Sequence, residues 1–357
     1  MEMLDQLRKY LADLWNKTRE QIIYQPVDKS SVDDTKDYVP LEYGRHYLRL
    51  WLTQVYLAQQ VKYLQSWFPA VHALVKFDFQ GTPVEFPTVA DASKVKMKQD
   101  TMKGDVIAAN YVLTPLIPFN NGTIELDAGL IAVQGENYLN NFISTLSDFS
   151  SLLAIPQFST ALSIAEPLAK GLQSLLSMGG VQLALHDGFA AGRTGGYWMA
   201  VRATKSQLDP AELLIRKDQL HVKNQYEPNQ SQQLEGYDYM LFRLEVTETG
   251  PDYTSLANIQ GPMKQAHQAL KDVEQEKADG FYRAAIIAAH ESPELTRADR
   301  IRVKQQLKDD YEELKKNLGF SGLVGDEYDL GKSMSRAISV DTALKMDEPS
   351  FAELFNV

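Results

Sequence analysis

Two stretches of the sequence come close to hydrolytic motifs, but each lacks a residue that the chemistry requires. Residues Gly319–Gly322 (Gly-Phe-Ser-Gly) approach a serine nucleophile elbow, yet Leu323 stands where the second glycine is needed, and a predicted helix rather than a strand precedes them. His290, followed by glutamate, begins like a zinc-protease helix, but Pro293 would break the turn and Glu294 replaces the second histidine. We therefore expect neither stretch to be catalytic.

Two further stretches contain residue types that bind ions. The acidic run at Asp326–Asp329 lacks the alternating carboxylates and the terminal glutamate of an EF-hand calcium loop. The glycine-rich residues Gly188–Gly196 could cradle an anion with Arg193 as the countercharge, but they lie between two predicted strands, which favours a hairpin loop. Because phosphate-loop, dinucleotide-binding and kinase motifs are also missing from the sequence, it predicts no catalytic, cofactor-binding or metal-ligating residues. A hydrolase whose carboxylates meet only in the folded chain stays open.

The composition indicates an ordinary globular protein without a nucleic-acid partner. The 357 residues carry 47 acidic and 36 basic side chains, and the net charge of −11 gives no general attraction for nucleic acid or anionic lipid. The absence of cysteine excludes disulfides and thiolate chemistry, and it suits a reducing compartment. The first twenty residues interleave charge with leucine, unlike a signal peptide. We therefore expect a cytoplasmic protein.

The first 67 residues are predicted to form an N-terminal helical arm. Leucines at helical spacing predict an amphipathic helix over residues 3–24, and Pro26 and Pro40 bound an exposed linker at 26–40. Residues 42–67 predict a second helix with an apolar surface wider than one stripe. This helix is expected either to be buried between other elements or to bind a partner.

Residues 70–250 are predicted to form a β-sandwich that is interrupted by a helical insertion. Period-two alternation predicts strands over residues 71–79, 83–86, 105–118, 122–133, 181–187, 196–204, 212–223 and 237–248, with a turn at Asn120–Gly122. Helical patterns interrupt this series over 137–178. With a C-terminal helical hairpin over 256–318 (helices at 262–290 and 294–318), the fold class is α+β with a mainly antiparallel sandwich.

The insertion and the C-terminus carry the least ordinary patterns. Residues 149–165 contain no charged side chain, so the insertion is expected to be buried, to form a partner interface or to enter a membrane conditionally. Residues 319–357 predict a flexible tail, in which Phe351, Leu354 and Phe355 have the spacing of a helix that docks into a groove. The tail could equally pack back on its own domain.

These apolar surfaces lead to the functional hypothesis. The sequence predicts a non-catalytic interaction or adaptor subunit of a cytoplasmic assembly, with a protein partner or a second copy of the chain as its ligand. The alternatives are a membrane-perturbing effector activated by proteolysis or a partner, and a hydrolase with a non-local site. The predicted partner-binding residues are Trp51, Tyr56, Trp67, Leu152, Leu153, Phe158, Leu162, Phe351, Leu354 and Phe355.

Overall fold

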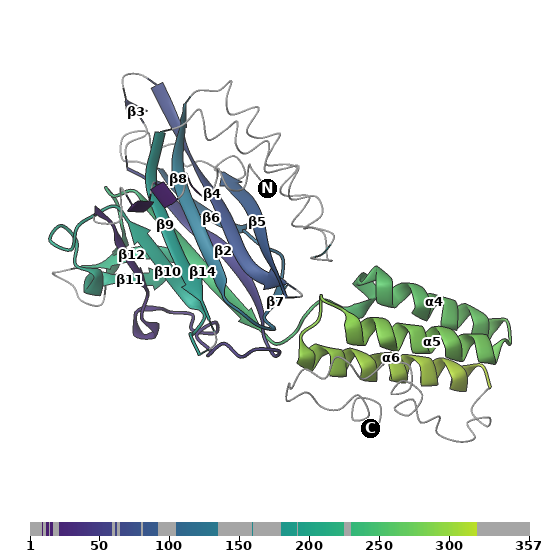
Figure 1. The fold of residues 1–357 in the computed structure, drawn as a ribbon. Helices are drawn as coiled ribbons and strands as arrows, with labels where there is room; N and C mark the ends of the chain where they lie inside the picture. Colours follow the sequence, from purple (N-terminus) through teal and green to yellow (C-terminus); the bar gives the residue numbers. More distant parts are fainter. Residues whose placement is uncertain are drawn as a thin grey trace. The chain divides into compact units, whose positions relative to one another are not determined.

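The computed structural model divides the chain into two compact units (Figure 1). It describes residues 21–58, 61–62, 65–79, 81–91, 105–134, 180–190, 192–224 and 230–319, together with Lys9, Ala12, Asp13, Trp15, Asn16 and Ser159. The sheet unit comprises residues 1–255 and Pro293–Arg297, and the helical unit comprises the remainder. The two units are described separately below.

The sheet unit contains three sheets among its described residues, and the strands of each sheet pair antiparallel. The large sheet has the order β1 (Ile23–Pro26), β10 (Gly196–Val201), β14 (Tyr239–Thr247), β2 (Tyr47–Leu57) and β6 (Asp105–Val112), with β7 (Ile117–Pro118) also paired to β2. The second sheet has the order β3 (Val61–Lys62), β4 (Gln65–Phe79), β8 (Ile124–Gln134) and β9 (Gly180–Phe189), with β5 (Thr82–Asp91) paired to β4. The small sheet consists of β11 (Leu213–Arg216), β12 (Gln219–Lys223) and β13 (Ser231–Gln233). Single 3-10 turns lie at η2 (Lys29–Ser31), η4 (Pro210–Glu212) and η5 (Tyr253–Ser255).

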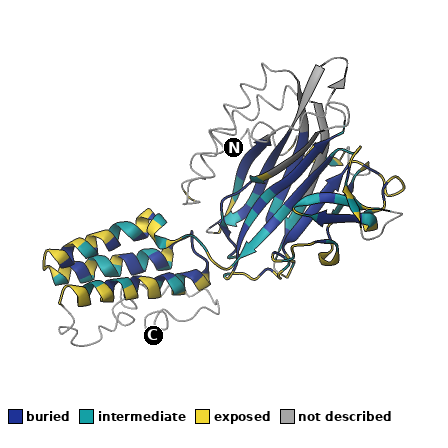
Figure 2. Cartoon of the chain, turned by 180° about the vertical axis from the view of Figure 1, so that it is seen from behind, coloured by how far each residue is buried: buried dark blue, intermediate teal, exposed yellow. Residues whose placement is uncertain are grey.

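Two apolar clusters lie on opposite faces of the large sheet. Figure 2 shows that many residues along the strands of the sheet unit are buried. One cluster joins the large sheet to the second sheet, with Leu50 and Phe242 from the former and Val75 and Leu126 from the latter. The other joins the large sheet to the small sheet, through residues such as Leu241, Ile215 and Leu220. The central strands of the large sheet therefore carry apolar side chains on both faces.

The helical unit contains α4 (Ala257–Lys271), α5 (Gln275–Glu291) and α6 (Arg297–Asn317). Small and medium apolar side chains such as Ile259, Ala266 and Ala285 are buried. The rings of Tyr282 and Tyr311 stack with centroids 4.5 Å apart, and the Tyr311 hydroxyl donates to Asp279 at 2.7 Å, so α5 and α6 are joined by an aromatic contact and a hydrogen bond. None of the helices in the described part of the chain has both the length and the hydrophobicity that crossing a bilayer requires.

The predicted helix at 42–67 is wrong, because these residues form β2, β3 and the start of β4. Leu48, Leu50 and Leu52 point to the cluster shared with the second sheet, while Arg49 and Trp51 alternate with them. A strand whose two faces are both largely covered carries apolar residues at nearly every position, and this pattern looks like a helix that is apolar over most of its surface.

Three further element predictions differ from the structure. The predicted linker at 26–40 is instead packed into the sheet unit, because Val27 and Val32 are buried in the core and Asp37 is only 4 % exposed. The predicted helix at 3–24 ends earlier, since Ile23 begins β1, although its described residues before Asn16 are helical. The predicted helix at 262–290 is two helices, interrupted at Val273, which has a φ of 63°.

The antiparallel strands over 70–250 and the α+β class are confirmed. The predicted strands correspond to β4 through β12 and to β14, with the turn before β8, where Gly122 has a φ of 69°. The stretches predicted as single strands at 105–118 and 212–223 are each two strands, and the sequence does not predict β13. The insertion at 137–178 lies outside the described residues apart from Ser159, and the tail at 319–357 lies outside them apart from Gly319.

We expect Gly195→Ala to destabilise the sheet unit by about 2–3 kcal/mol, the usual effect of overpacking. A Cβ atom at this position would lie 2.4 Å from the carbonyl oxygen of Asp37, and backbone cannot move aside cheaply. Urea unfolding followed by tryptophan fluorescence measures this unit selectively, because all four tryptophans precede residue 256.

Gly188→Ala is the matched control for Gly195→Ala. Its Cβ would meet only the Glu125 side chain, at an ordinary 3.7 Å, so we expect a change below about 0.5 kcal/mol. Equal unfolding midpoints for the two variants would contradict the close approach of residue 37 to residue 195.

Candidate functional site

A row of side chains from four strands crosses the large sheet on the face opposite the second sheet. The register pairs Tyr197 with Arg243, Arg243 with Trp51, and Trp51 with Val112. Because side chains alternate between the faces of a strand, Arg243 points away from the core that holds Phe242 and Leu244. The strand pairing alone therefore places a guanidinium group between a phenol and an indole.

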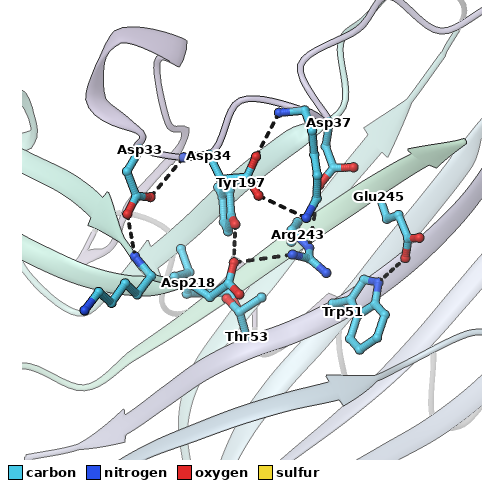
Figure 3. Close-up of polar contacts among 12 residues, drawn as sticks. Asp33, Asp34, Asp37, Trp51, Thr53, Tyr197, Asp218, Arg243 and Glu245 are labelled. Carbon is cyan, nitrogen blue, oxygen red and sulfur yellow. Dashed lines mark hydrogen bonds and ion pairs between the residues drawn. The ribbon is translucent and has the colours of Figure 1, made fainter.

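Arg243 is the centre of a charged group that we call the Arg243 cluster: Arg243, Asp37, Asp218 and Tyr197 (Figure 3). Its guanidinium donates to Asp218 at 3.3 Å, and its Nε lies 3.7 Å from a carboxylate oxygen of Asp37. The Tyr197 hydroxyl donates to the same Asp218 carboxylate. Only 11 % of the Arg243 side chain and 5 % of the Asp37 side chain are exposed, so this ion pair is largely removed from water.

Each carboxylate of the cluster comes from a segment that the cluster fixes in place. Asp218 lies in the two-residue turn between β11 and β12, where Lys217 and Asp218 both have positive φ, as a type I′ hairpin turn requires. The N–H of Lys217 donates to Asp33 at 2.8 Å, and the N–H of Val246 donates to Asp37 at 3.3 Å. Residues 33–37, the small-sheet turn and β14 are thereby joined.

Burial and charge pairing act in opposite directions on the groups of the cluster. It raises the pKa of Asp37, against the opposing effects of the Val246 N–H and of Arg243. Burial alone would lower the pKa of Arg243, but the Tyr197 hydroxyl and the carboxylates of Asp218 and Asp37 raise it overall. Arg243 therefore stays charged, and removing it would strand a buried carboxylate.

Beside the cluster, an indole is held in a fixed position by polar and charged neighbours. The Trp51 Nε1–H donates to Glu245 at 2.5 Å, and the guanidinium carbons of Arg243 and Arg49 lie 5.1 Å and 5.9 Å from the ring centroid, within cation–π range. The side chains of Arg49 and Glu245 are 29 % and 25 % exposed, and Trp51 and Val112 are partly exposed. We call the residues Arg49, Trp51, Val112, Arg243 and Glu245 the Trp51 platform.

A buried histidine fixes the loop that leads into β2. The Nδ1 atom of His46 accepts the N–H of Glu42 at 3.0 Å, and its carbonyl oxygen accepts the N–H of Phe119. The residue is only 4 % exposed, and this burial lowers the pKa of His46 despite the nearby carboxylates of Glu42 and Glu248. Because an N–H already points at Nδ1, the neutral tautomer carries its proton on Nε2.

The structure places the predicted partner-binding residues in different environments. Trp51 lies on the partly exposed platform, whereas Tyr56 is 1 % exposed and stacks on Tyr239, so it belongs to the core. Trp67 lies in β4, but its side chain is not described. The residues outside the described part of the chain are Leu152, Leu153, Phe158, Leu162, Phe351, Leu354 and Phe355.

Sequence reasoning missed the residues that hold Trp51 in place. Arg243 and Glu245 are two positions apart in an otherwise apolar strand. Side chains at this spacing point to the same face of a sheet, and this signal could have identified the two residues as neighbours. No comparable signal exists for Asp37 and Asp218, because they reach Arg243 from loops that are distant in sequence. Arg193, which the sequence offered as an anion-binding residue, instead pairs with both carboxylate oxygens of Asp187 at 3.0 Å.

We expect Arg243→Met to lower the free energy of unfolding of the sheet unit by about 3 kcal/mol, because it leaves Asp37 buried without a cation. Adding Asp37→Asn and Asp218→Asn to this variant should restore part of the loss, since no stranded charge then remains. The control is Arg202→Met: the Arg202 side chain is 41 % exposed, so its pair with Asp238 should contribute less than about 1 kcal/mol. Equal losses in Arg243→Met and Arg202→Met by urea unfolding would refute the cluster's role.

Acid should weaken the fold in part through His46. The pKa of His46 is lower in the folded protein than in the unfolded chain, where it is about 6.5. The contribution of such a histidine to stability is complete above pH 6.5 and is lost as the pH falls toward the pKa of the folded state. The pKa of His72 is lowered to about 3 by complete burial, and it acts in the same direction. We expect His46→Asn, whose Oδ1 can accept the same Glu42 N–H, to flatten the stability profile below pH 6.5. The change should not exceed about 1.4 kcal/mol per pH unit, the limit for one proton.

Urea titrations of the wild type and His46→Asn at pH 5 to 8 test this expectation. The two proteins should have similar stabilities at pH 8 and should diverge below pH 6.5. Parallel profiles over the whole range would show that His46 does not contribute to the acid sensitivity.

The side chains of the Arg243 cluster and the Trp51 platform form ion pairs and hydrogen bonds with one another. Within the described ranges, no three His, Cys, Asp or Glu side chains are grouped so that they could hold a metal ion. Arg243, Glu245 and Asp218 each contact an opposite charge or a hydrogen-bond partner, so the site fixes side chains rather than presenting a free acid or base. No protein-family model matches the chain, and no curated protein matches it significantly.

Proposed function

We propose that this protein is a non-catalytic interaction subunit, an adaptor in a cytoplasmic multiprotein assembly, and that it contacts its partner through the Trp51 platform. The partner is another protein or a second copy of the chain. The observation that carries the proposal is a partly exposed indole flanked by two guanidinium groups and hydrogen-bonded to Glu245. Tryptophan and arginine are the residue types most enriched at the energetic centres of protein interfaces.

Preorganisation supports a binding role for this surface. A side chain that is already held in one conformation loses little entropy when a partner covers it, and this raises affinity without new contacts. Glu245 restrains the ring of Trp51 from its edge, and Arg243 is restrained in turn by Asp37 and Asp218. The restraint of the platform thus extends from the indole to two loops.

The scaffold that we propose beneath this surface is a β-sandwich formed by the large and second sheets. Their shared apolar cluster, with Leu50 and Phe242 from one and Val75 and Leu126 from the other, supports this arrangement. Strands are stiffer supports than loops for a binding surface, because ladder hydrogen bonds fix their backbone and packing fixes their side chains. The membrane-perturbing alternative depends on residues 137–178, outside the described residues, and no structural observation favours it.

The test is to identify a partner of the full-length protein in its native cell and to reconstitute the pair from purified components. We expect Trp51→Ala to weaken the measured affinity by about thirtyfold, the loss of about 2 kcal/mol that is typical of a hot spot. Trp51→Phe keeps a ring but removes the N–H that bonds to Glu245, so its affinity should lie between those of the wild type and Trp51→Ala. Sedimentation of the wild type and Trp51→Ala alone tests whether the partner is a second copy.

Tyr43→Ala is the control for the loss of an aromatic side chain. Tyr43 is 47 % exposed and is not part of the platform, so its removal should change the affinity by less than about threefold. The proposal fails if Trp51→Ala and Tyr43→Ala bind equally well while both remain folded by circular dichroism.

A further inference from the structure

A second surface feature of the sheet unit is a pocket of about 310 Å³ at the end of β14. The loop before β2 lines one side, and Val246, Thr247 and Glu248 line the other. Val39, Pro40 and Val246 make apolar walls, while the remaining lining is mostly charged. A small concave site with apolar walls and a few polar groups is the usual form of a ligand pocket.

The charges around the pocket leave a local excess of one negative charge. Arg45 lies between Glu42 and Glu248, at 3.2 Å and 2.9 Å, so two carboxylates share one guanidinium. Lys36, the other cation of the lining, is paired with Asp34 at 2.9 Å and contributes no net charge. A ligand with a single positive charge would therefore complete the pairing.

The pocket is also lined by a histidine whose Nε2 can act as a hydrogen-bond donor. The side chain of His46 is 6 % exposed, and the Glu42 N–H on Nδ1 requires the neutral ring to carry its proton on Nε2. Glu248 Oε1 lies 3.9 Å from Nε2, which is too long for a hydrogen bond. A ligand that brings an acceptor would therefore complete the hydrogen bonding of the His46 ring.

These two requirements define the ligand class. The cation must lie near the Glu248 carboxylate and the acceptor near His46 Nε2, so the two groups of the ligand must be close neighbours. In the first residue of a polypeptide, the α-ammonium and the carbonyl oxygen of the same residue are separated by only two carbon atoms. A lysine side chain lacks the acceptor, and a free amino acid adds a carboxylate next to Glu42 and Glu248.

We propose that this pocket binds the amino terminus of a polypeptide, with the ammonium group at Glu248 and Glu42 and the first carbonyl oxygen at His46 Nε2. Val39, Pro40 and Val246 contact the first side chain, which selects an apolar residue. The binding is weak and salt-dependent, because the side chains of Glu42 and Glu248 are 55 % and 60 % exposed and solvent screens their charge.

The experiment titrates the full-length protein at low ionic strength with four small molecules, monitored by heteronuclear NMR of the histidine rings. Leucinamide carries both the ammonium group and the carbonyl oxygen. N-acetyl-leucinamide lacks the charge, 3-methylbutylamine lacks the acceptor, and leucine adds the carboxylate. We expect leucinamide to bind saturably, to shift the His46 resonances, and to bind about fivefold more tightly than each of the others. A peptide beginning with leucine should bind as leucinamide does.

Two variants separate the two contacts. Glu248→Gln should weaken the binding of leucinamide about fivefold, whereas Glu212→Gln, at a partly exposed acid elsewhere on the unit, should leave it unchanged. His46→Asn keeps the acceptor for the Glu42 N–H but has no Nε2 donor, so it should make leucinamide and 3-methylbutylamine bind equally.

Three results would overturn the proposal: no saturable binding of leucinamide up to its solubility limit, equal binding of the acetylated compound, or equal effects of Glu248→Gln and Glu212→Gln. These probes do not involve the partner of the Trp51 platform. Failure of the pocket proposal would therefore leave the adaptor proposal standing, and the converse also holds.

Discussion

The guanidinium group of Arg243, held between the carboxylates of Asp37 and Asp218, is the interaction on which the described surface depends. Two like charges are unfavourable in a partly buried site without a cation, so Arg243 helps to hold in place the loops that carry them. The same group lies over the ring of Trp51, whose edge is bonded to Glu245. The position of Trp51, the proposed contact residue, thus depends on the ion pairs of Arg243.

The backbone adapts to this arrangement at the points where loop and sheet come closest. Gly195 lets the carbonyl of Asp37 approach β10, and Gly196, with a φ of 113°, lies against the ring of Tyr38. The hydroxyl of Tyr38 donates to the carbonyl of Val27. Residues 26–40 look like a linker in sequence because they are polar, yet their few apolar side chains and Asp37 are bound to the large sheet.

Much of the β fold could be predicted from the sequence because alternation is a local property. The prediction from alternation failed at β2. There Leu48, Leu50 and Leu52 face one core and Tyr56 faces the other, so polar and apolar residues do not alternate. The site was less accessible, because its contacts join residues far apart in the chain: Asp37 binds Val246 across 209 positions, and Trp51 binds Glu245 across 194. No local pattern encodes such pairs, and only the polar residues within β14 give a hint of them.

Hydrogen–deuterium exchange of the wild type and Arg243→Met tests most directly whether one guanidinium joins these segments. The account predicts that exchange accelerates together at residues 33–38, at the Lys217–Asp218 turn and at Val246, whose amide donates to Asp37. The amides of α4–α6 serve as an internal reference and should be unchanged. Acceleration confined to the immediate neighbours of residue 243 in β14, with the two loops as protected as in the wild type, would contradict it.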